Sequence, residues 1–349
     1  MRIRSAILMA SLLGAGAVRA ASTPSAALLV LAKSDRTLSI VDPSNLKVIA
    51  RMPSGPDPHE VIASADGKFA YISNYGGGAY NTLTVVDLVG QKTAGTVDLG
   101  ALRGPHGLMY AGGKVWFTAE AAKAIGSYDP ETKKIDLILG TGQNRTHMIY
   151  VFEELTRIVT SNISSATMTM IEKGAVGGAP GPGPGAGRGP GGPPGRPRPE
   201  DWNETVIPVG RGAEGFDVSP DAKELWAANA QDGTVSVIDI AAKKVVKTLD
   251  ANVRGANRLK FTPDGKLALI STLSGPDVVV FDTASRNEVK RVKVGRGAAG
   301  IQMQPDGARV FVACTPDDYV AIMDLKTLAV TGHLDAGKQP DGMAWAVHP

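Results

Sequence analysis

The sequence predicts an all-β fold, a seven-bladed β-propeller in which one blade is closed by strands from the N- and C-termini. A strand-like pattern ending in Asp recurs through the 349 residues, with copies that end at Asp42, Asp87, Asp129, Asp239, Asp282 and Asp324. The steps between them are 45, 42, 110, 43 and 42 residues. The long step contains a degenerate copy ending at Glu172 and an insertion, which makes seven copies. A period of about 42 residues is typical of a propeller blade.

Each repeat is expected to form four short strands joined by tight turns. In the copy that starts at Glu214, a strand from Gly215 is followed by the turn SPDAK, the strand ELWAAN, the turn AQDG, the strand TVSVID and a fourth strand around KVVKTLD. Pro-Asp and Asp-Gly pairs favour tight turns, and β-branched residues favour strands. Apolar residues almost nowhere follow helical spacing, which argues against an α/β fold.

The two ends of the chain complement each other. The C-terminal stretch DGMAWAV matches a first strand with no blade after it, and ALLVLAKSDRTLSIVD supplies the later strands of a blade that lacks its first. We therefore expect the two termini to share one blade, which leaves no open sheet edge in the ring.

Residues 1–20 are predicted to be a secretory signal peptide, so the propeller domain spans 21–349. Arg2 and Arg4 precede an apolar run from Ala6 to Val18, and Ala20 ends a small-residue pattern that a signal peptidase recognises. The run is shorter than the roughly 20 apolar residues of a membrane-spanning helix, so we expect no transmembrane segment. The expected location is the periplasm or the exterior.

The charge balance argues against a global attraction to polyanions. Three of the 37 basic residues and none of the acids lie within residues 1–20, so the mature chain has 34 basic and 34 acidic residues. A neutral chain has no overall pull on nucleic acid or anionic membranes, although a local patch could still bind nucleic acid. We expect a monomer.

The stretch from Gly174 to Glu200 is predicted to interrupt the fourth blade between its third and fourth strands. Its glycine and proline content precludes a packed core, so we expect a disordered or polyproline-like loop on the face opposite the turn that contains RGPH. It is either a passive spacer or a segment whose arginines, Arg188, Arg196 and Arg198, contact a polyanion.

The recurring elements SADGK, TPDGK, QPDGA and TVSVID resemble those of YVTN-repeat propellers of the YncE type, over nearly the whole mature chain. The resemblance implies the propeller fold. It does not single out an activity, because surface-layer proteins, DNA-binding periplasmic proteins, lactonases and quinoprotein subunits share this architecture. No catalytic motif of those relatives matches residues here, so no catalytic residue is assigned.

One position recurs at the start of the first strand of each blade. It lies seven residues before Asp66, Asp221, Asp264 and Asp306 of the turns, and the remaining copies are matched by their sequence. In chain order the residues are His59, His106, His147, Glu214, Asn257, Ala299 and Asp341. First strands line the central channel of a propeller, so this ring should circle one end of the channel.

The ring predicts a binding site for a small ligand. Six of its seven members are polar, and three are imidazoles on consecutive blades. His59, His106 and His147 are candidate ligands of a divalent metal ion, and Glu214 or Asp341 could complete the shell. Two other interpretations stay open: a polar ligand bound without metal, or histidines that only bond neighbouring backbone in a water-filled funnel. No other cofactor is indicated.

Basic residues precede the ring positions. Arg103, Arg211, Arg254, Arg296 and Lys338 lie three residues before a ring residue, and Arg145 lies two before. They are either solvated loop residues or a cationic collar for carboxylates, phosphates or sugar acids, whose planar oxyanions match guanidinium groups.

The function predicted from these observations is that of a cell-envelope binding or scaffold protein. It would recognise a protein partner or a small anionic ligand at the channel-mouth face, in keeping with a sequence that shows no nucleophile motif or cofactor fingerprint. The alternative is a metal-assisted lyase or lactonase, in which the histidines hold the metal and Glu214 or Asp341 is the acid or base. A partner subunit for a quinoprotein or electron-transfer chain is a third interpretation.

Overall fold

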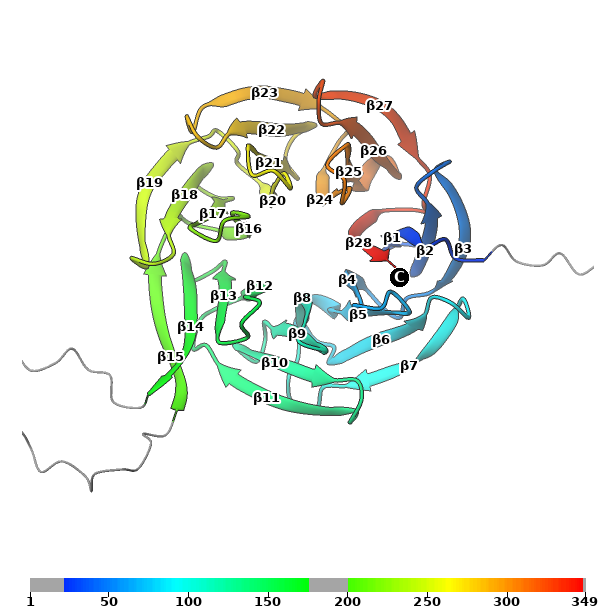
Figure 1. Cartoon of the computed structure of the whole chain (residues 1–349), viewed down its shortest axis with the longest axis horizontal. Coiled ribbons are helices and arrows are strands. Elements are labelled where there is room, and N and C mark those ends of the chain that lie inside the picture. The colour runs from blue at the N-terminus through cyan, green and yellow to red at the C-terminus, as the bar shows by residue number, and fades with distance from the viewer. Residues whose placement is uncertain (1–21, 176–199, 348–349) are drawn as a thin grey trace, which may run out of the picture.

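A computed structural model describes residues 22–175 and 200–347, which form a ring of seven antiparallel four-stranded sheets (Figure 1). The predicted all-β, seven-bladed fold is confirmed. Besides strands, the described residues contain two short 3-10 turns, η1 (Gly76–Gly78) and η2 (Thr315–Asp317). The predicted signal peptide lies outside the described residues. Within the described ranges, no helix is long and apolar enough to cross a membrane.

The blades are numbered from the one that contains both ends of the chain, and their strands are given from the axis outward. Blade 1 consists of β28 (Pro340–Val347), β1 (Ala26–Ala32), β2 (Thr37–Asp42) and β3 (Lys47–Pro53). Blade 2 consists of β4 (Pro58–Ala63), β5 (Phe69–Asn74), β6 (Thr82–Asp87) and β7 (Lys92–Asp98). Blade 3 consists of β8 (Pro105–Ala111), β9 (Lys114–Ala119), β10 (Ala124–Asp129) and β11 (Lys134–Gly140). Blade 4 consists of β12 (Thr146–Val151), β13 (Arg157–Asn162), β14 (Thr167–Ala175) and β15 (Glu200–Pro208).

The remaining three blades follow the same order. Blade 5 consists of β16 (Ala213–Val218), β17 (Glu224–Asn229), β18 (Thr234–Asp239) and β19 (Lys244–Asp250). Blade 6 consists of β20 (Ala256–Phe261), β21 (Leu267–Thr272), β22 (Asp277–Asp282) and β23 (Glu288–Lys293). Blade 7 consists of β24 (Ala298–Met303), β25 (Arg309–Cys314), β26 (Tyr319–Asp324) and β27 (Ala329–Leu334).

The core lies between neighbouring sheets. In the third strand β18 the four central residues are buried, whereas in the outermost strand β11 exposed and half-buried residues alternate. Trp226 of blade 5 meets Phe261 of blade 6 edge-on, with ring centroids 5.6 Å apart. Burial of such apolar faces is the main favourable contribution to folding, so each blade depends on its neighbours for stability.

Blade 1 joins the two ends of the chain. Strand β1 pairs antiparallel with β28, which places Leu28 opposite Trp345 and Val30 opposite Met343. The other edge of β1 pairs with β2. This confirms the predicted closure of one blade by both termini, because β28 covers the inner edge of β1.

Every innermost strand is irregular at its second and third residues. In blade 2 the register of β4 against β5 shifts between Pro58 and Val61, and in blade 3 that of β8 against β9 shifts between Pro105 and Leu108. The other five blades have the same irregularity at the same place. A β-bulge re-aims a side chain, so the second residue of each innermost strand, which is the ring position, faces the axis.

Three buried hydroxyls join these irregular segments to the next blade. Thr118 Oγ1 accepts a hydrogen bond from the N–H of Gly107 at 2.9 Å and donates one to the carbonyl of His147 at 2.7 Å. Ser161 and Ser271 make the equivalent pair of bonds in blades 4 and 6. The receiving carbonyls belong to the ring residues His147, Glu214 and Ala299. The hydroxyls therefore hold one blade at a set distance from the next.

Glycine follows the ring position in four blades because the innermost strands approach closely there. A Cβ atom on Gly107, Gly215, Gly300 or Gly342 would lie 2.2–2.6 Å from the carbonyl oxygen of the next blade's ring residue. That separation is far shorter than a carbon–oxygen contact, so a larger residue would force two blades apart.

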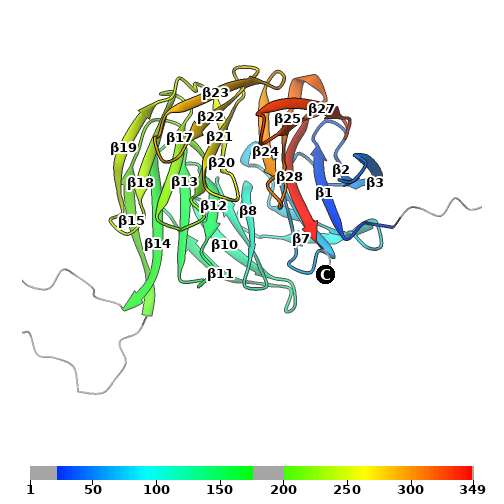
Figure 2. The ribbon, with the colours of Figure 1, turned by 45° about the horizontal axis from the view of Figure 1, so that its top comes forward.

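The predicted insertion begins and ends in paired strands. Gly174 and Ala175 belong to β14 and Glu200 belongs to β15, with Ala175 as the register partner of Glu200. These are the third and fourth strands of blade 4, so their junction lies on the face opposite the ring positions (Figure 2). The rest of the insertion, residues 176–199, lies outside the described residues.

Replacing Gly300 by Ala is expected to lower the free energy of unfolding by about 2 kcal/mol or more, because the Asp341 backbone cannot move away without opening the inner ring. Gly332→Ala on the outer strand β27 is the matched control, since a Cβ there would meet no atom within 4 Å. The control should change stability by less than about 0.5 kcal/mol. Urea unfolding followed by tryptophan fluorescence measures both, and equal midpoints would contradict the close-approach argument.

Candidate functional site

The structure brings all seven ring residues together around one cavity of about 330 Å³ at the axis. We call this space the mouth cavity. Its ring members are His59, His106, His147, Glu214, Asn257, Ala299 and Asp341. Lys33, Tyr75, Arg145 and Arg258 line the same space, so imidazole, carboxylate, amide and cationic groups all face a volume that suits a small ligand.

The three imidazoles lie side by side along one wall of the mouth cavity. The ring centroids of His59 and His106 are 5.0 Å apart, and those of His106 and His147 are 3.9 Å apart. Tyr75 meets both His59 and His106 edge-on. Side chains from three consecutive blades can therefore act on one bound group.

Lys33 holds His59 in the neutral form. The Nζ atom of Lys33 lies 2.8 Å from Nε2 of His59 and 3.3 Å from Oδ2 of Asp341. Burial lowers the pKa of His59, and the charge of Lys33 lowers it further. Because an ammonium group can only donate, Nε2 of His59 accepts this hydrogen bond and is not free to bind a metal ion.

His147 lies between two carboxylates. Its Nδ1 is hydrogen-bonded to Oε1 of Glu120, and its Nε2 lies 3.0 Å from Oε1 of Glu214 without the alignment of a hydrogen bond. Burial alone would lower the pKa of His147, but Glu214 and Glu120 outweigh burial and raise it. Burial would raise the pKa of both acids, and His147 more than offsets this, so the pKa of each is lowered.

The pKa of His106 is shifted in the opposite direction from that of His147. His106 is 4% exposed, and its Nδ1 has no hydrogen-bond partner within residues 22–175 and 200–347. Burial, and then the charges of His147 and His59, lower its pKa well below 6.5. Nε2 of His147 and Oδ1 of Asn257 are likewise buried without a hydrogen bond in the described chain, although Glu214 lies 3.0 Å from Nε2 of His147. Unpartnered buried polar atoms are uncommon, so three of them at one cavity indicate a place for a ligand.

Lys33 and Glu120 lie beside the imidazoles and were not anticipated from the sequence. Lys33, Tyr75 and Glu120 each directly follow the second strand of their blade, after β1, β5 and β9. Leu273 and Thr315 hold the same position in blades 6 and 7 and also line the mouth cavity. Aligning the repeats at the ends of their second strands, as was done for their first strands, would have located this position.

Glu120 is fixed in place by its neighbours. Oη of Tyr75 donates to Oε2 of Glu120 at 2.5 Å, and Nε of Arg145 lies 3.4 Å from the same oxygen. Burial and the hydrogen bond to Glu120 raise the pKa of Tyr75 to about 12, so its hydroxyl stays a donor at neutral pH. The carboxylate in turn orients the imidazole of His147.

His106, Glu120 and His147 form a group that could hold a metal ion. One donor atom from each lies within 4.8 Å of the other two, and all three residues are buried. Bonds of about 2.0–2.2 Å to a tetrahedral ion require donors about 3.3–3.6 Å apart, so modest side-chain shifts would close the group around one ion. This group differs from the predicted triplet in that Glu120 takes the place of His59.

Of the collar arginines, Arg145 lines the mouth cavity, whereas Arg103, Arg211, Arg254 and Arg296 lie outside it. Nε of Arg211 pairs with Asp232 at 2.8 Å and Nε of Arg296 pairs with Asp317 at 2.6 Å, although both arginine side chains are more than two-thirds exposed, at 72% and 74%. Arg254 donates to the carbonyl of Gln231 at 2.7 Å, and Arg103 is exposed. The aspartates come from loops between second and third strands, and they neutralise two of the collar charges.

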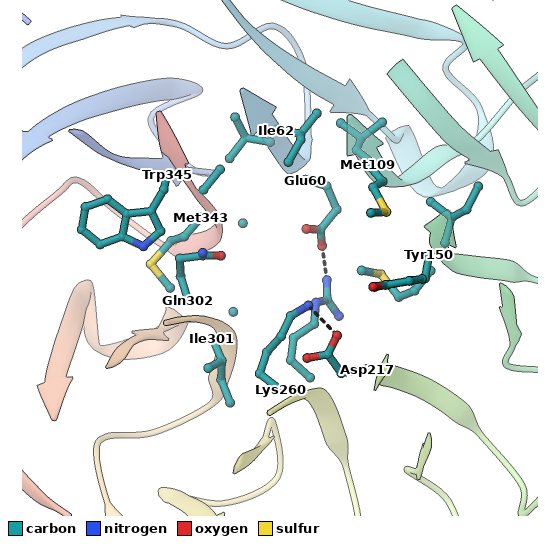
Figure 3. Close-up of a pocket in the computed structure, with 18 of the residues that line it drawn as sticks. Glu60, Ile62, Met109, Tyr150, Asp217, Lys260, Ile301, Gln302, Met343 and Trp345 are labelled. Atoms are coloured by element: carbon teal, nitrogen blue, oxygen red, sulfur yellow. Dashed lines mark hydrogen bonds and ion pairs between the residues drawn. The ribbon is translucent and has the colours of Figure 1, made fainter. Parts of the chain in front are cut away.

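Arg258 lies at the boundary between the mouth cavity and a second cavity of about 340 Å³. Figure 3 shows this second cavity. Its buried guanidinium pairs with Glu60, which joins blade 6 to the non-adjacent blade 2. Lys260 and Asp217, 3.4 Å apart, line the second cavity. Its labelled apolar and aromatic wall residues include Ile62, Met109, Tyr150, Ile301, Met343 and Trp345. The ion pair between Arg258 and Glu60 forms a floor beneath the mouth cavity.

Solved structures match the fold, whereas no family model and no curated protein matches the chain. A protein of unknown function from Desulfotomaculum acetoxidans aligns with a TM-score of 0.69 and 12% identity over 90% of this chain and 98% of its own. A provisionally assigned 6-phosphogluconolactonase from Bacteroides uniformis aligns with a TM-score of 0.69 and 13% identity over 92% and 99%. Kuenenia stuttgartiensis hydrazine synthase aligns with a TM-score of 0.63 and 18% identity over 82% and 89%. These similarities establish the propeller fold alone.

Buried neutral His106 should make the protein less stable in acid. Its native pKa lies well below 6.5, so below about pH 6.5 the unfolded chain binds a proton there and the native chain does not. The free energy of unfolding then falls by up to about 1.4 kcal/mol per pH unit for this group. In His106→Gln, the decrease in the free energy of unfolding that His106 causes between about pH 6.5 and 5 should disappear. Urea unfolding at a series of pH values measures this.

His147 supplies an internal control because its sign is reversed. Its raised pKa contributes stability that is present below about pH 6.5 and is lost as the pH rises through the native value. His147→Gln should therefore remove a contribution that increases the free energy of unfolding at low pH, whereas His106→Gln removes one that decreases it. Parallel pH dependence in wild type and His106→Gln would contradict the assignment of His106 as a buried neutral group.

Proposed function

We propose that the protein binds a small anionic ligand in the mouth cavity through a divalent metal ion held by His106, His147 and a neighbouring carboxylate. The observation that carries the proposal is a pair of buried imidazole nitrogens, Nδ1 of His106 and Nε2 of His147, without a hydrogen-bond partner in the described chain. Imidazole nitrogens are common ligands of zinc, copper and nickel, and adjacent rings with free nitrogens fit that role.

The two acids beside His147 suit two different tasks. Glu120 bonds Nδ1 of His147, as in the carboxylate–histidine–metal arrangement, where the acid orients a ring whose other nitrogen binds the ion. Glu214 lies 3.0 Å from that other nitrogen, Nε2, and can join the metal shell. Metal binding displaces the proton that the two acids stabilise on His147.

The charges of the mouth cavity favour a cation as the first ligand. Each basic side chain that lines it has an acidic neighbour within the described chain: Lys33 has Asp341, Arg145 has Glu120 and Arg258 has Glu60. An anion alone would compete with these pairs. A metal ion beside Glu120 and Glu214 would add positive charge where acids already gather, and its open positions could then take an anionic oxygen of the ligand.

A metal-assisted lyase or lactonase is the second candidate, favoured by His59. This imidazole is held neutral by Lys33, and its ring centroid lies 5.0 Å from that of His106. A metal ion can polarise a carbonyl group, and a neutral imidazole beside it can accept a proton. The Bacteroides uniformis neighbour is named for lactonase activity, and it shares the fold with this chain at 13% identity.

We also propose that the chain is exported to the periplasm or secreted, and that it is a YVTN-repeat propeller of the YncE type. The support for export is the pattern of Arg2, Arg4 and the apolar run that ends before Ala20. The support for the family is the set of repeat elements, such as TPDGK and TVSVID, that recur along the blades.

Untagged protein loaded with zinc or copper and freed of excess ion should retain about one equivalent of metal, as measured by elemental analysis. His106→Ala and His147→Ala should each lower the retained metal at least about tenfold, because each removes a ligand. His59→Ala should retain the metal, since Lys33 already occupies Nε2 of His59.

His333→Ala is the matched control for these substitutions. His333 lies on the outer strand β27, away from the mouth cavity, so its loss should leave the metal content unchanged. Less than about a tenth of an equivalent in the loaded wild-type protein, or full retention in His106→Ala, would overturn the metal proposal.

A further inference from the structure

A groove of about 710 Å³, twice the volume of the mouth cavity, lies between blades 2 and 3. It is lined by residues of the turn between the first two strands of blade 2 and of the turn between the last two strands of blade 3. Both turns lie on the face opposite the mouth cavity, so the groove is a separate site. We call it the tyrosine groove after Tyr71, Tyr110 and Tyr128, which line it with Phe69 and Val97.

The three tyrosines form a compact aromatic wall. The rings of Tyr71 and Tyr110 are stacked with centroids 6.3 Å apart, and Tyr128 meets Tyr71 edge-on at 6.4 Å. No residue of the described chain hydrogen-bonds to their hydroxyls. Phe69 adds an apolar edge that is 37% exposed. The groove thus offers rings for packing and hydroxyl donors for a ligand's acceptors.

Small residues on the outer strand β7 leave this wall uncovered. Ala94, Gly95 and Thr96 line the groove and are exposed. Gly95 pairs with Val85 just before the register shift of its blade, and in blades 3, 5 and 6 the corresponding outer-strand residues are larger. Those residues are Leu137, Lys247 and Lys290. In blades 1 and 7 the corresponding residues, Ala50 and Gly332, are small as they are in blade 2.

The electrostatic environment of the groove is acidic. Burial raises the pKa of Tyr110, and the charges of Asp66, Glu131 and Asp129 raise it further. Asp66 and Glu131 line the groove, with Lys133 as a basic residue beside them. Protonated tyrosine hydroxyls in a negative potential suit a ligand that carries carbonyl acceptors, apolar rings and positive charge.

We propose that the tyrosine groove binds this chain's own residues 176–199 as a polyproline II segment. This stretch contains eight prolines and three arginines and no acid, and it includes two consecutive P-x-x-P motifs, from Pro190 to Pro193 and from Pro194 to Pro197. A polyproline II helix leaves its carbonyls without internal hydrogen bonds, and P-x-x-P segments dock in aromatic grooves. The tyrosine hydroxyls would donate to those carbonyls, and Glu131 would attract the arginines.

The segment starts and ends on the blade next to the groove. Ala175 and Glu200, which precede and follow it, lie on blade 4, next to blade 3, and their junction is on the same face as the groove (Figure 2). Polyproline II rises about 3.1 Å per residue, so Pro190, ten residues before Glu200, can lie about 30 Å from the start of β15. A short tether gives an effective concentration in the millimolar range, so even weak docking would populate the bound form.

Limited trypsin digestion of the full chain tests this docking. Arg188 is followed by Gly, whereas Arg196 and Arg198 are followed by Pro, so trypsin cleaves the segment after Arg188. Docking next to that bond should protect it. We expect cleavage in the wild type to be at least about fivefold slower than in the double variant Tyr110→Phe, Glu131→Lys, because the undocked fraction sets the rate.

Glu153→Lys is the matched control, because it makes the same charge change at an exposed turn of blade 4 outside the groove. It should keep the wild-type rate. Raising the salt concentration should accelerate cleavage of the wild type and not of the double variant. Thermal melts of all variants serve to check that each is folded. Equal rates in wild type and double variant would overturn the proposal, and so would protection that grows with protein concentration, since the occupant would then come from a second copy.

Discussion

The hydroxyl bridges between neighbouring innermost strands determine the geometry of the mouth. Each bridge bonds both the bulged segment of its own blade and the carbonyl of the next ring residue, as Thr118 does for His147. The bulge aims the ring side chain at the axis, and glycine after the ring position lets the strands approach. The ring residues His147, Glu214 and Ala299 are therefore each held by their own blade and by the preceding one.

This rigidity explains why opposite charges persist in the buried mouth. Removing charges from water is costly, and it is tolerated when partners are held at short distance. His147 has an acid on each side, and Arg258 has Glu60 from across the ring. His106 has no such partner and stays neutral. The pKa of His147 is raised by Glu214 and Glu120, whereas burial lowers the pKa of His59 and of His106.

The repeat predicted the fold and the ring because both follow from features that recur in every blade. Asp-ending strands and turn pairs mark the period, and the ring position keeps a fixed distance from the turn. The position that follows the second strand can be counted in the same way, but Lys33, Tyr75 and Glu120 share no chemistry, so the repeat does not show which of them contact the imidazoles. The collar pairs, such as Arg211 with Asp232, join two separate loops, and a spacing count cannot show that the aspartates neutralise the arginines.

The closure of blade 1 by β28 makes the mouth dependent on pairing between two segments that lie far apart in the sequence. Ala26 pairs with Val347, so this sheet forms only when β28 meets β1. Lys33 follows β1 and Asp341 lies in β28, and their contact at 3.3 Å exists only in the closed ring. A chain truncated before Pro340 would retain most blades, yet it would lack one wall of the mouth cavity and expose the edge of β1 to self-association. Occupancy of the mouth would therefore report whether β28 has closed blade 1.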